Sequence, residues 1–215
     1  MAIKLMSAGG GSLMLDAEST ASNLTLTVPA NAGKMITTAS GGRELPKAAL
    51  PAGAVLQTVY THKTSTWSAS CSGNTLYDVT GLAATITPTS ATSLILVQAT
   101  IYMGGNQNAY NFRYQLKRNG TAVIVGDAEG GRVVSTGYLN IYDNDATTGG
   151  YQVGNVGGTH MDAPASTSAL TYQVAVAGYN GSTVYINRSH NWQNSPANGY
   201  DSVPVSSIIL MEIAV

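Results

Sequence analysis

The stretch NFRYQLKRNGTAVIVGD, residues 111–127, contains the clearest indication of the fold in this sequence. Asn119-Gly120 can occupy both central positions of a type I′ turn, where the backbone needs a positive φ. Because such a loop has only two residues, it joins two antiparallel strands and fixes their register. That register predicts Leu116 opposite Val123, Tyr114 opposite Val125 and Arg118 opposite Thr121.

Successive side chains of a strand point to opposite faces, so the predicted hairpin has two different sides. One side is apolar and consists of Phe112, Tyr114, Leu116, Val123 and Val125. The other side carries Arg113, Gln115 and Lys117. The hairpin therefore has one dry and one solvated face, and we expect the rest of the chain to supply strands that cover the dry face.

The composition also favours strands over helices. Charged residues make up 10% of the 215 residues, against about 25% in an average soluble protein. Glycine, serine, threonine and asparagine are abundant, and few strong helix formers occur at a consistent spacing. The sequence therefore predicts an all-β protein.

Neither nucleic acid nor a membrane is an expected partner. The net charge of −1 provides no overall basic field, and the longest apolar runs, 94–97 and 208–211, are far too short to cross a bilayer. Cys71 is the only cysteine and cannot form an intrachain disulfide. No apolar signal segment follows Met1, so we expect synthesis in a reducing compartment and a soluble chain.

Strand signals recur from residue 54 onward. Candidate strands cover 55–66, 75–79, 82–87 and 93–103, while 129–168 is rich in turn formers and shows only short pieces such as 153–156. Residues 169–189 predict a second hairpin with a three-residue loop at 179–181, which pairs Val174 with Ile186 and Val176 with Val184. The last strand, 206–215, is apolar on both sides except for Glu212, which indicates either a central strand or burial between subunits.

Three segments follow from this pattern. Residues 1–42 form an N-terminal arm, with short strands near 13–16 and 24–28 that are too small to make a core of their own. Residues 43–53 form a proline-containing linker, and 54–215 form the distal domain. About eight strands without a credible helix predict an antiparallel β-sandwich of jelly-roll type, with an immunoglobulin-like sandwich as the alternative.

Several ordered blocks resemble tail-fibre-like virion proteins of tailed phages, especially those of aquatic bacteria. They are IKLMSAGGGSLMLDAESTASNLTLTVPA near the N-terminus, the linker ELPKAALPAGAVLQ, and then RNGT, GD, TYQV, YINRSH and SSIILMEIAV. The resemblance implies a non-enzymatic virion component that is homotrimeric. It also implies an arm that binds other virion proteins and a tip that binds a glycan or protein on the host surface. The chain departs from long fibres in lacking a shaft, so a short fibre or a capsid decoration protein fits the pattern.

No catalytic motif or cofactor site is evident. The three histidines, His62, His160 and His190, form no HExxH pattern, and neither GxSxG nor a P-loop occurs. A triad of His160, Asp162 and Ser166 can be imagined, but we expect these to be loop residues. Asp143-Asn144-Asp145 could hold a calcium ion, although turn formation is the simpler role, so the sequence predicts no metal. A depolymerase would need paired carboxylates, and the acidic residues here are scattered.

Ligand binding through tyrosine is the activity that the sequence supports best. The chain has 12 tyrosines and one phenylalanine, and a tyrosine ring with its polar edge suits wet interfaces and stacking on sugars. The candidate residues lie in two loop regions: Tyr138, Tyr142, Asp143, Asp145 and Tyr151 in the first, and Trp192 and Tyr200 in the second. The alternative is that these tyrosines pack between subunits.

Overall fold

The computed structural model describes residues 3–6, 12–15, 50–106, 111–140, 149–191 and 202–215. The chain divides into two compact units, Met1–Leu45 and Pro46–Val215, and each is described by itself. In the first unit, β1 (Ile3–Met6) pairs with β2 (Ser12–Leu15) in an antiparallel hairpin. The strand predicted near 13–16 corresponds to β2, and the one predicted at 24–28 lies outside the described residues.

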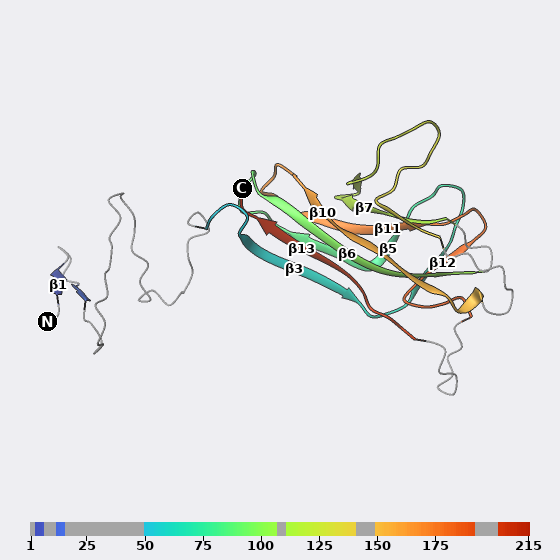
Figure 1. The fold of residues 1–215 in the computed structure, drawn as a ribbon, viewed down its shortest axis with the longest axis horizontal. Coiled ribbons are helices and arrows are strands. Elements are labelled where there is room, and N and C mark those ends of the chain that lie inside the picture. Colours follow the sequence, from blue (N-terminus) through green and yellow to red (C-terminus); the bar gives the residue numbers. More distant parts are fainter. Residues whose placement is uncertain (1–2, 7–11, 16–49, 107–110, 141–148, 192–201) are drawn as a thin grey trace. The chain divides into compact units, whose positions relative to one another are not determined.

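The second unit consists of two antiparallel sheets, so the predicted all-β fold is confirmed (Figure 1). Its described residues contain no α-helix, and no helix that could span a membrane occurs in them. The elements are β3 (Val55–Lys63), β4 (Trp67–Ser70), β5 (Tyr77–Ile86), β6 (Leu94–Gly105), β7 (Phe112–Arg118), β8 (Thr121–Val123), β9 (Gly137–Leu139), the 3₁₀ turn η3 (Gly149–Tyr151), β10 (Val153–Asp162), β11 (Leu170–Ala177), β12 (Thr183–Ile186) and β13 (Ser206–Ile213).

The first sheet has four strand lines, two of which are interrupted. Strand β6 pairs with β10 along one edge, and along its other edge with β13 and then β12. On the far side β13 pairs with β3 and β12 with β4. The successive lines are therefore β3 with β4, β13 with β12, β6, and β10.

The second sheet also has four lines. Strand β11 lies between β5 and β7. The free edge of β7 pairs with β8 at one end and with β9 at the other, so these two short strands form one interrupted line.

The order of these eight lines along the chain is informative. The first line pairs with the last, the second with the seventh, the third with the sixth and the fourth with the fifth. This is the order obtained when one long hairpin is rolled into two sheets. We infer that the sandwich is a jelly roll rather than an immunoglobulin-like fold.

A single apolar core fills the space between the two sheets. Its largest fully buried side chains are Tyr114, Tyr172, Phe112, Leu82, Ile86, Ile95, Ile101, Met103, Leu116, Ile186, Ile208 and Leu210. They come from alternate positions of strands in both sheets, as expected for two pleated faces in contact. Free Cys71 is buried in the same core.

The prediction of a hairpin around Asn119-Gly120 is correct near the turn and wrong beyond it. Leu116 pairs with Val123 and Arg118 with Thr121 around Asn119-Gly120, as predicted. The strand ends there, because Ile124 takes a φ of 55°, and Tyr114 pairs with Gly137 of β9 instead of with Val125. The face predicted to be solvated is also largely covered, since Arg113 and Gln115 are buried and Gln115 donates to the Val134 carbonyl at 2.7 Å.

The second predicted hairpin is wrong. Strands β11 and β12 flank the 179–181 loop but belong to different sheets, so Val174 and Val176 do not pair with Ile186 and Val184. All four side chains are instead buried in the core between the two sheets. A strand with an alternating apolar pattern can bury its apolar side chains against a strand of the opposite sheet just as well as beside a strand with which it pairs.

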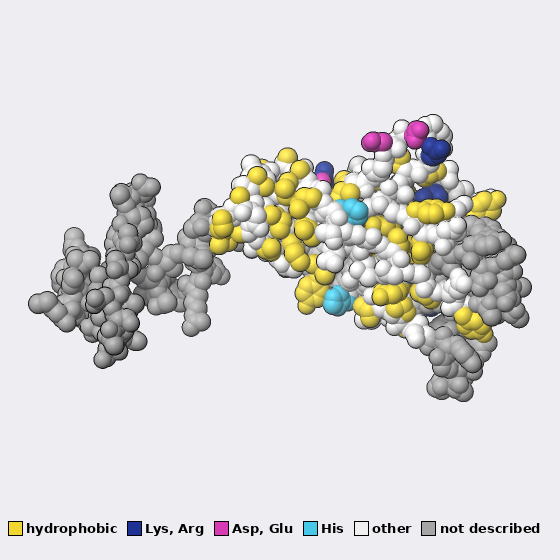
Figure 2. Space-filling model, in the orientation of Figure 1, with side chains coloured by type: hydrophobic (Ala, Val, Ile, Leu, Met, Phe, Trp, Pro, Cys, Tyr) yellow, Lys and Arg dark blue, Asp and Glu magenta, His cyan; other side chains and the backbone are white. Residues whose placement is uncertain are grey.

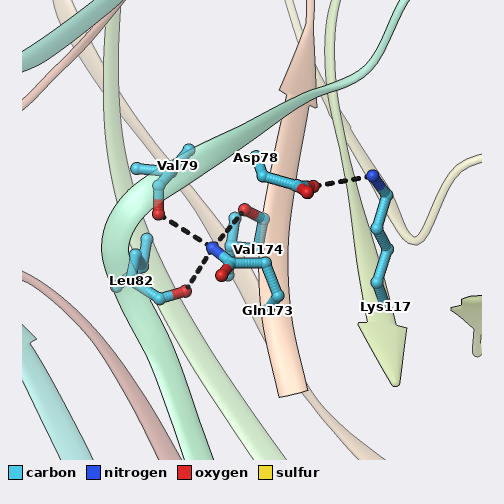
Figure 3. Close-up of polar contacts among 6 residues, drawn as sticks. All are labelled: Asp78, Val79, Leu82, Lys117, Gln173 and Val174. Atoms are coloured by element: carbon cyan, nitrogen blue, oxygen red, sulfur yellow. Dashed lines mark hydrogen bonds and ion pairs between the residues drawn. The ribbon is translucent and has the colours of Figure 1, made fainter. Parts of the chain in front are cut away.

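Two of the predicted short strands form one strand with a bulge. Strand β5 (Tyr77–Ile86) overlaps both 75–79 and 82–87, and Gly81 takes a φ of 81° where its register with β11 shifts. The Gln173 amide fills the gap by donating to the carbonyls of Val79, Leu82 and Val174 (Figure 3). Nearby, Lys117 forms a 2.6 Å ion pair with Asp78.

The last strand, β13, is central in its sheet, which is one of its two predicted positions. Its one acidic residue, Glu212, is fully buried. The carboxylate accepts from Gln57 Nε2 (2.5 Å), from Thr89 N (2.6 Å) and from Thr89 Oγ1 (2.7 Å). Burial raises the pKa of Glu212, but hydrogen bonds from Gln57, Thr89 and Ser93 outweigh it, and the net pKa is lowered.

Candidate binding surfaces

The connections between strands divide between the two ends of the sandwich. At one end, β6 finishes, β10 and β12 begin opposite it, and β4 finishes beside β12. The connections 71–76, 106–111, 140–152 and 178–182 therefore start and finish at this end, which we call the loop end. At the opposite end the chain enters the domain and leaves it, since Gly53 N donates to Ala214 O and Ala214 N to Ala54 O.

Backbone and side-chain hydrogen bonds tie the described loops of the loop end together. Cys71 N donates to Ser182 O, and Gly181 N donates to Cys71 O. Gly73 N donates to Asn180 Oδ1 at 2.9 Å. Segments from the two sheets are thus joined there, which gives a fixed base for any binding surface.

Two of the predicted ligand residues lie in the described part of the chain, and the fold brings both to the loop end. Tyr138, on β9, is 54% exposed and its hydroxyl donates to Asn111 Oδ1. Tyr151, in η3, is 36% exposed. They belong to different sheets, because β9 pairs with β7 whereas η3 leads into β10. Tyr142, Asp143, Asp145, Trp192 and Tyr200 lie outside the described residues.

The position opposite Tyr138 is occupied by Arg113, a residue that the sequence placed on a solvated face. Its guanidinium is buried and donates weakly to Asn74 Oδ1 at 3.4 Å, and its Nε has no hydrogen-bond partner among the described residues. Burial lowers the pKa of Arg113. Arg113 is therefore a buried cation beneath this part of the surface, and Tyr138 is the exposed residue of the pair.

A second aromatic cluster at the loop end was not predicted from the sequence. The Tyr185 hydroxyl lies 2.9 Å from His190 Nδ1, and the Arg188 guanidinium lies 4.3 Å from the centroid of the Tyr185 ring. The segment that carries Arg188 crosses close over Gly104, where a Cβ would lie 2.3 Å from the Arg188 carbonyl oxygen. The YINRSH letters contain all three residues, but only the fold shows that they turn back on one another.

Other tyrosines belong to the core rather than to a surface. Tyr114 and Tyr172 are fully buried, and their hydroxyls meet β10 across the sandwich. Tyr172 donates to Asp162 Oδ2 at 2.6 Å, and Tyr114 lies 3.3 Å from His160 Nε2. Burial raises the pKa of both phenols, and the neighbouring Asp162 carboxylate raises that of Tyr172 further. Neither ligand binding nor subunit contact accounts for these two.

His160, Asp162 and Ser166, the residues of the imagined triad, each interact with other residues and not with one another. His160 and Asp162 are on one strand and face different tyrosines, and Asp162 also accepts a 2.6 Å ion pair from Arg118. Ser166 Oγ accepts from the backbone N–H of Ser168. Among the described residues, no group of three or more His, Cys, Asp or Glu side chains could hold a metal ion, and Asp143-Asn144-Asp145 lies outside them.

The outer face of the first sheet is apolar. Neighbouring positions on β3, β13, β6 and β10 bring together Tyr60, Leu94, Leu96, Met161, Ile209, Met211 and Ile213, which we call the outer patch. Tyr60 is 65% exposed and Met161 49% exposed. The residues between them in these rows are Thr, Gln, Ser, Gly and His, with no Lys, Arg, Asp or Glu. Figure 2 shows hydrophobic side chains gathered over this sheet towards the end where the chain terminates.

Comparison with known proteins leaves the family open. No family model matches the chain, and a search of curated proteins finds no match. Solved structures that align with it include the dimeric latent PorU of Porphyromonas gingivalis (9% identity, TM-score 0.32, 76% of this chain and 14% of that chain). Structures of infectious bursal disease virus align likewise: the Gx strain (11%, 0.32, 75% and 39%) and the Gt strain (12%, 0.32, 81% and 40%). The chain spans less than half of each, and at this TM-score the likeness carries no argument about function.

Proposed function

We propose that this chain is a non-enzymatic structural protein of a phage virion, a short homotrimeric fibre. Its N-terminal arm attaches to other virion proteins, and its sandwich domain is a tip that binds a glycan or protein on the host surface. The ordered resemblance to tail-fibre-like proteins is the starting point of this proposal.

The observation that carries the proposal is that the two ends of the sandwich differ. The chain enters and leaves at one end, and Tyr138 of β9 and Tyr151 of η3 lie at the other. A domain held at the end where its chain enters presents the opposite end to the surroundings. Exposed tyrosines, with an apolar ring and a polar edge, suit recognition of a sugar surface.

The outer patch supports the proposed assembly of identical copies. A patch with large apolar side chains and no formal charge is suited to burial against another apolar surface. A second copy offers such a surface, whereas a charged partner would lose hydration there without compensation.

Native mass spectrometry of the full chain tests the assembly, and we expect a mass of three copies. A stable protomer in dilute solution would contradict it. For attachment, we expect a variant without residues 1–45 to keep a folded tip but not to join particles. Complete loss of structure in that variant would mean that the arm belongs to the core.

The alternative is a capsid decoration protein, which the short 43–53 linker favours because no shaft separates arm from tip. The two proposals share fold and symmetry and differ in location. Immunogold labelling of intact particles distinguishes them, because a fibre is labelled at the tail and a decoration protein over the head.

A further inference from the structure

The strand line formed by β3 and β4 breaks at residues 64–66, on the flank of the sandwich next to β5. An open, shallow cavity of ≈ 460 Å³ lies at this break, lined by His62, Lys63, Thr64, Ser65, Thr66, Trp67, Thr80 and Gly81. It is large enough for one sugar ring to rest in it while remaining partly exposed. The break itself is held in place, because the Asn187 side-chain amide donates to the carbonyls of Lys63 (2.7 Å) and Ser65 (3.1 Å).

Lys63 is the unusual residue of this cavity. It is 6% exposed, and it reaches across the edge of the sandwich to within 3.7 Å of the position that a Cβ on Gly81 would occupy. Its ammonium has three donors, yet among the described residues its only hydrogen-bond partner is Ser65 Oγ at 3.0 Å, and no carboxylate lies within ion-pair distance. A buried, unpaired ammonium is costly to keep.

The remaining lining suits a sugar. Thr64, Ser65, Thr66 and Thr80, which carry hydroxyl groups, line the cavity together with the aromatic residues Trp67 and His62. His62 in turn contacts Tyr60, with the ring centroids 5.1 Å apart. Aromatic rings with nearby hydroxyl groups can hold both the apolar face and the hydroxyls of a saccharide.

We propose that this cavity is a binding site for an acidic saccharide, in which Lys63 pairs with the single negative charge of a sugar carboxylate. A monoanion fits better than a phosphate, because the cavity offers one lysine, whereas a phosphate carries about −1.5 to −2 charges and favours a cluster of cations. The proposal names a ligand class for the host-surface binding proposed above. It rests on that function only for the source of the sugar, because the site lies on the flank and not at the loop end.

Calorimetric titration of the full chain with glucuronate, glucose and inorganic sulfate tests the site. We expect glucuronate to bind and glucose to bind at least about tenfold more weakly, since it lacks the charge. Lys63→Met keeps the aliphatic stem and should reduce glucuronate affinity at least about tenfold, whereas Lys63→Arg should retain most of it. Lys117→Met removes a lysine from the other sheet and should leave binding unchanged.

A second variant keeps the test decisive if Lys63→Met does not fold. Thr80 is exposed on β5 at the cavity wall, so Thr80→Trp should block the cavity while Lys63 remains. Any one of three results would overturn the proposal. The first is equal binding of glucose and glucuronate, and the second is unchanged glucuronate binding in Lys63→Met or Thr80→Trp. The third is binding of sulfate without binding of glucuronate. If Lys63→Met loses glucuronate but the chain is absent from virions, the site stands and the proposed function fails. If the protein binds host cells but has no affinity for glucuronate, the proposed function stands and the proposed site fails.

Discussion

Ser206 Oγ donates a 2.6 Å hydrogen bond to Asn187 Oδ1, although the two residues are nineteen positions apart. Asn187 follows β12 directly and Ser206 begins β13, and the two strands lie along the same edge of β6. Between them, both backbone groups of Tyr102 are satisfied: its carbonyl accepts from Asn187 N, and its N–H donates to Ser206 Oγ. This pair continues the sheet across a gap in the strand line.

We expect Asn187→Ala to destabilise the fold by about 3 kcal/mol, because two buried hydrogen bonds and one part-buried hydrogen bond are lost. In addition, alanine is strained at a φ of 60°. Ser206→Ala should cost about 1–2 kcal/mol. Urea denaturation measures both, and the double variant should cost less than the sum of the two. Asn155→Ala, at an exposed position on β10, is the control and should stay within about 0.5 kcal/mol. Additive effects of Asn187 and Ser206 would contradict the coupling.

Glu212→Gln should destabilise the protein by about 1–3 kcal/mol at neutral pH, because an amide nitrogen would face donors. The parent has a lowered pKa at Glu212 in the folded state. Its contribution is therefore complete above the ordinary carboxyl pKa of 4.5 and is lost as the pH falls through the lower folded value. Thermal melts between pH 7 and pH 3 should show a shallower acid decline in Glu212→Gln than in the parent. The control, Glu129→Gln in an exposed ion pair, should follow the parent, and an equally steep decline in both variants would contradict the role of Glu212.

Gly120→Val should cost about 1–3 kcal/mol, because a β-branched residue resists the φ of 82° that the turn requires. No atom lies within 4 Å of the position of a Cβ, so the effect comes from the backbone alone. Gly131→Val is a matched control, since its Cβ would also meet nothing and its φ is not in the left-handed range. Equal melting temperatures for the two variants would rule out a backbone requirement at Gly120.

Charges in the outer patch should prevent assembly without unfolding the protomer. We expect Tyr60→Lys combined with Met161→Lys to give a mass of one copy by native mass spectrometry, with an unchanged circular dichroism spectrum, because a lysine cannot be buried there unpaired. Tyr179→Lys, at a position 56% exposed on the β11–β12 connection, should not alter the assembly. A trimer that persists with both patch lysines would move the interface to another face.

Local features of the sequence predicted the fold well, and features that depend on distant strands were predicted poorly. The Asn119-Gly120 turn was placed correctly because its register follows from two residues. Only the start of β10, residues 153–156, was predicted, because glycines interrupt the apolar pattern of the rest. One of these glycines is required: a Cβ on Gly157 would lie 2.0 Å from the Ala99 carbonyl oxygen. The 169–189 segment shows the same limit, since alternation does not distinguish pairing from facing.

The candidate site was predicted in part. Tyr138 and Tyr151 are exposed at one end of the domain, but Tyr185, Arg188 and His190 were not grouped because their contact depends on the turn after β12. The sequence did not indicate that Lys63 is buried, because a single lysine in a strand is ordinarily solvated. Its burial depends on the break between β3 and β4 and on the bulge in β5.

The central place of β13 has a consequence for biosynthesis. The first sheet cannot close on the ribosome until β13 has left the exit tunnel, because among the described strands β3 and β6 are joined only through β13. Translation products that lack β13 are therefore expected to expose two unpaired strand edges, which are templates for aggregation. A stop codon before Ser206 would yield insoluble polypeptide rather than a shortened working protein.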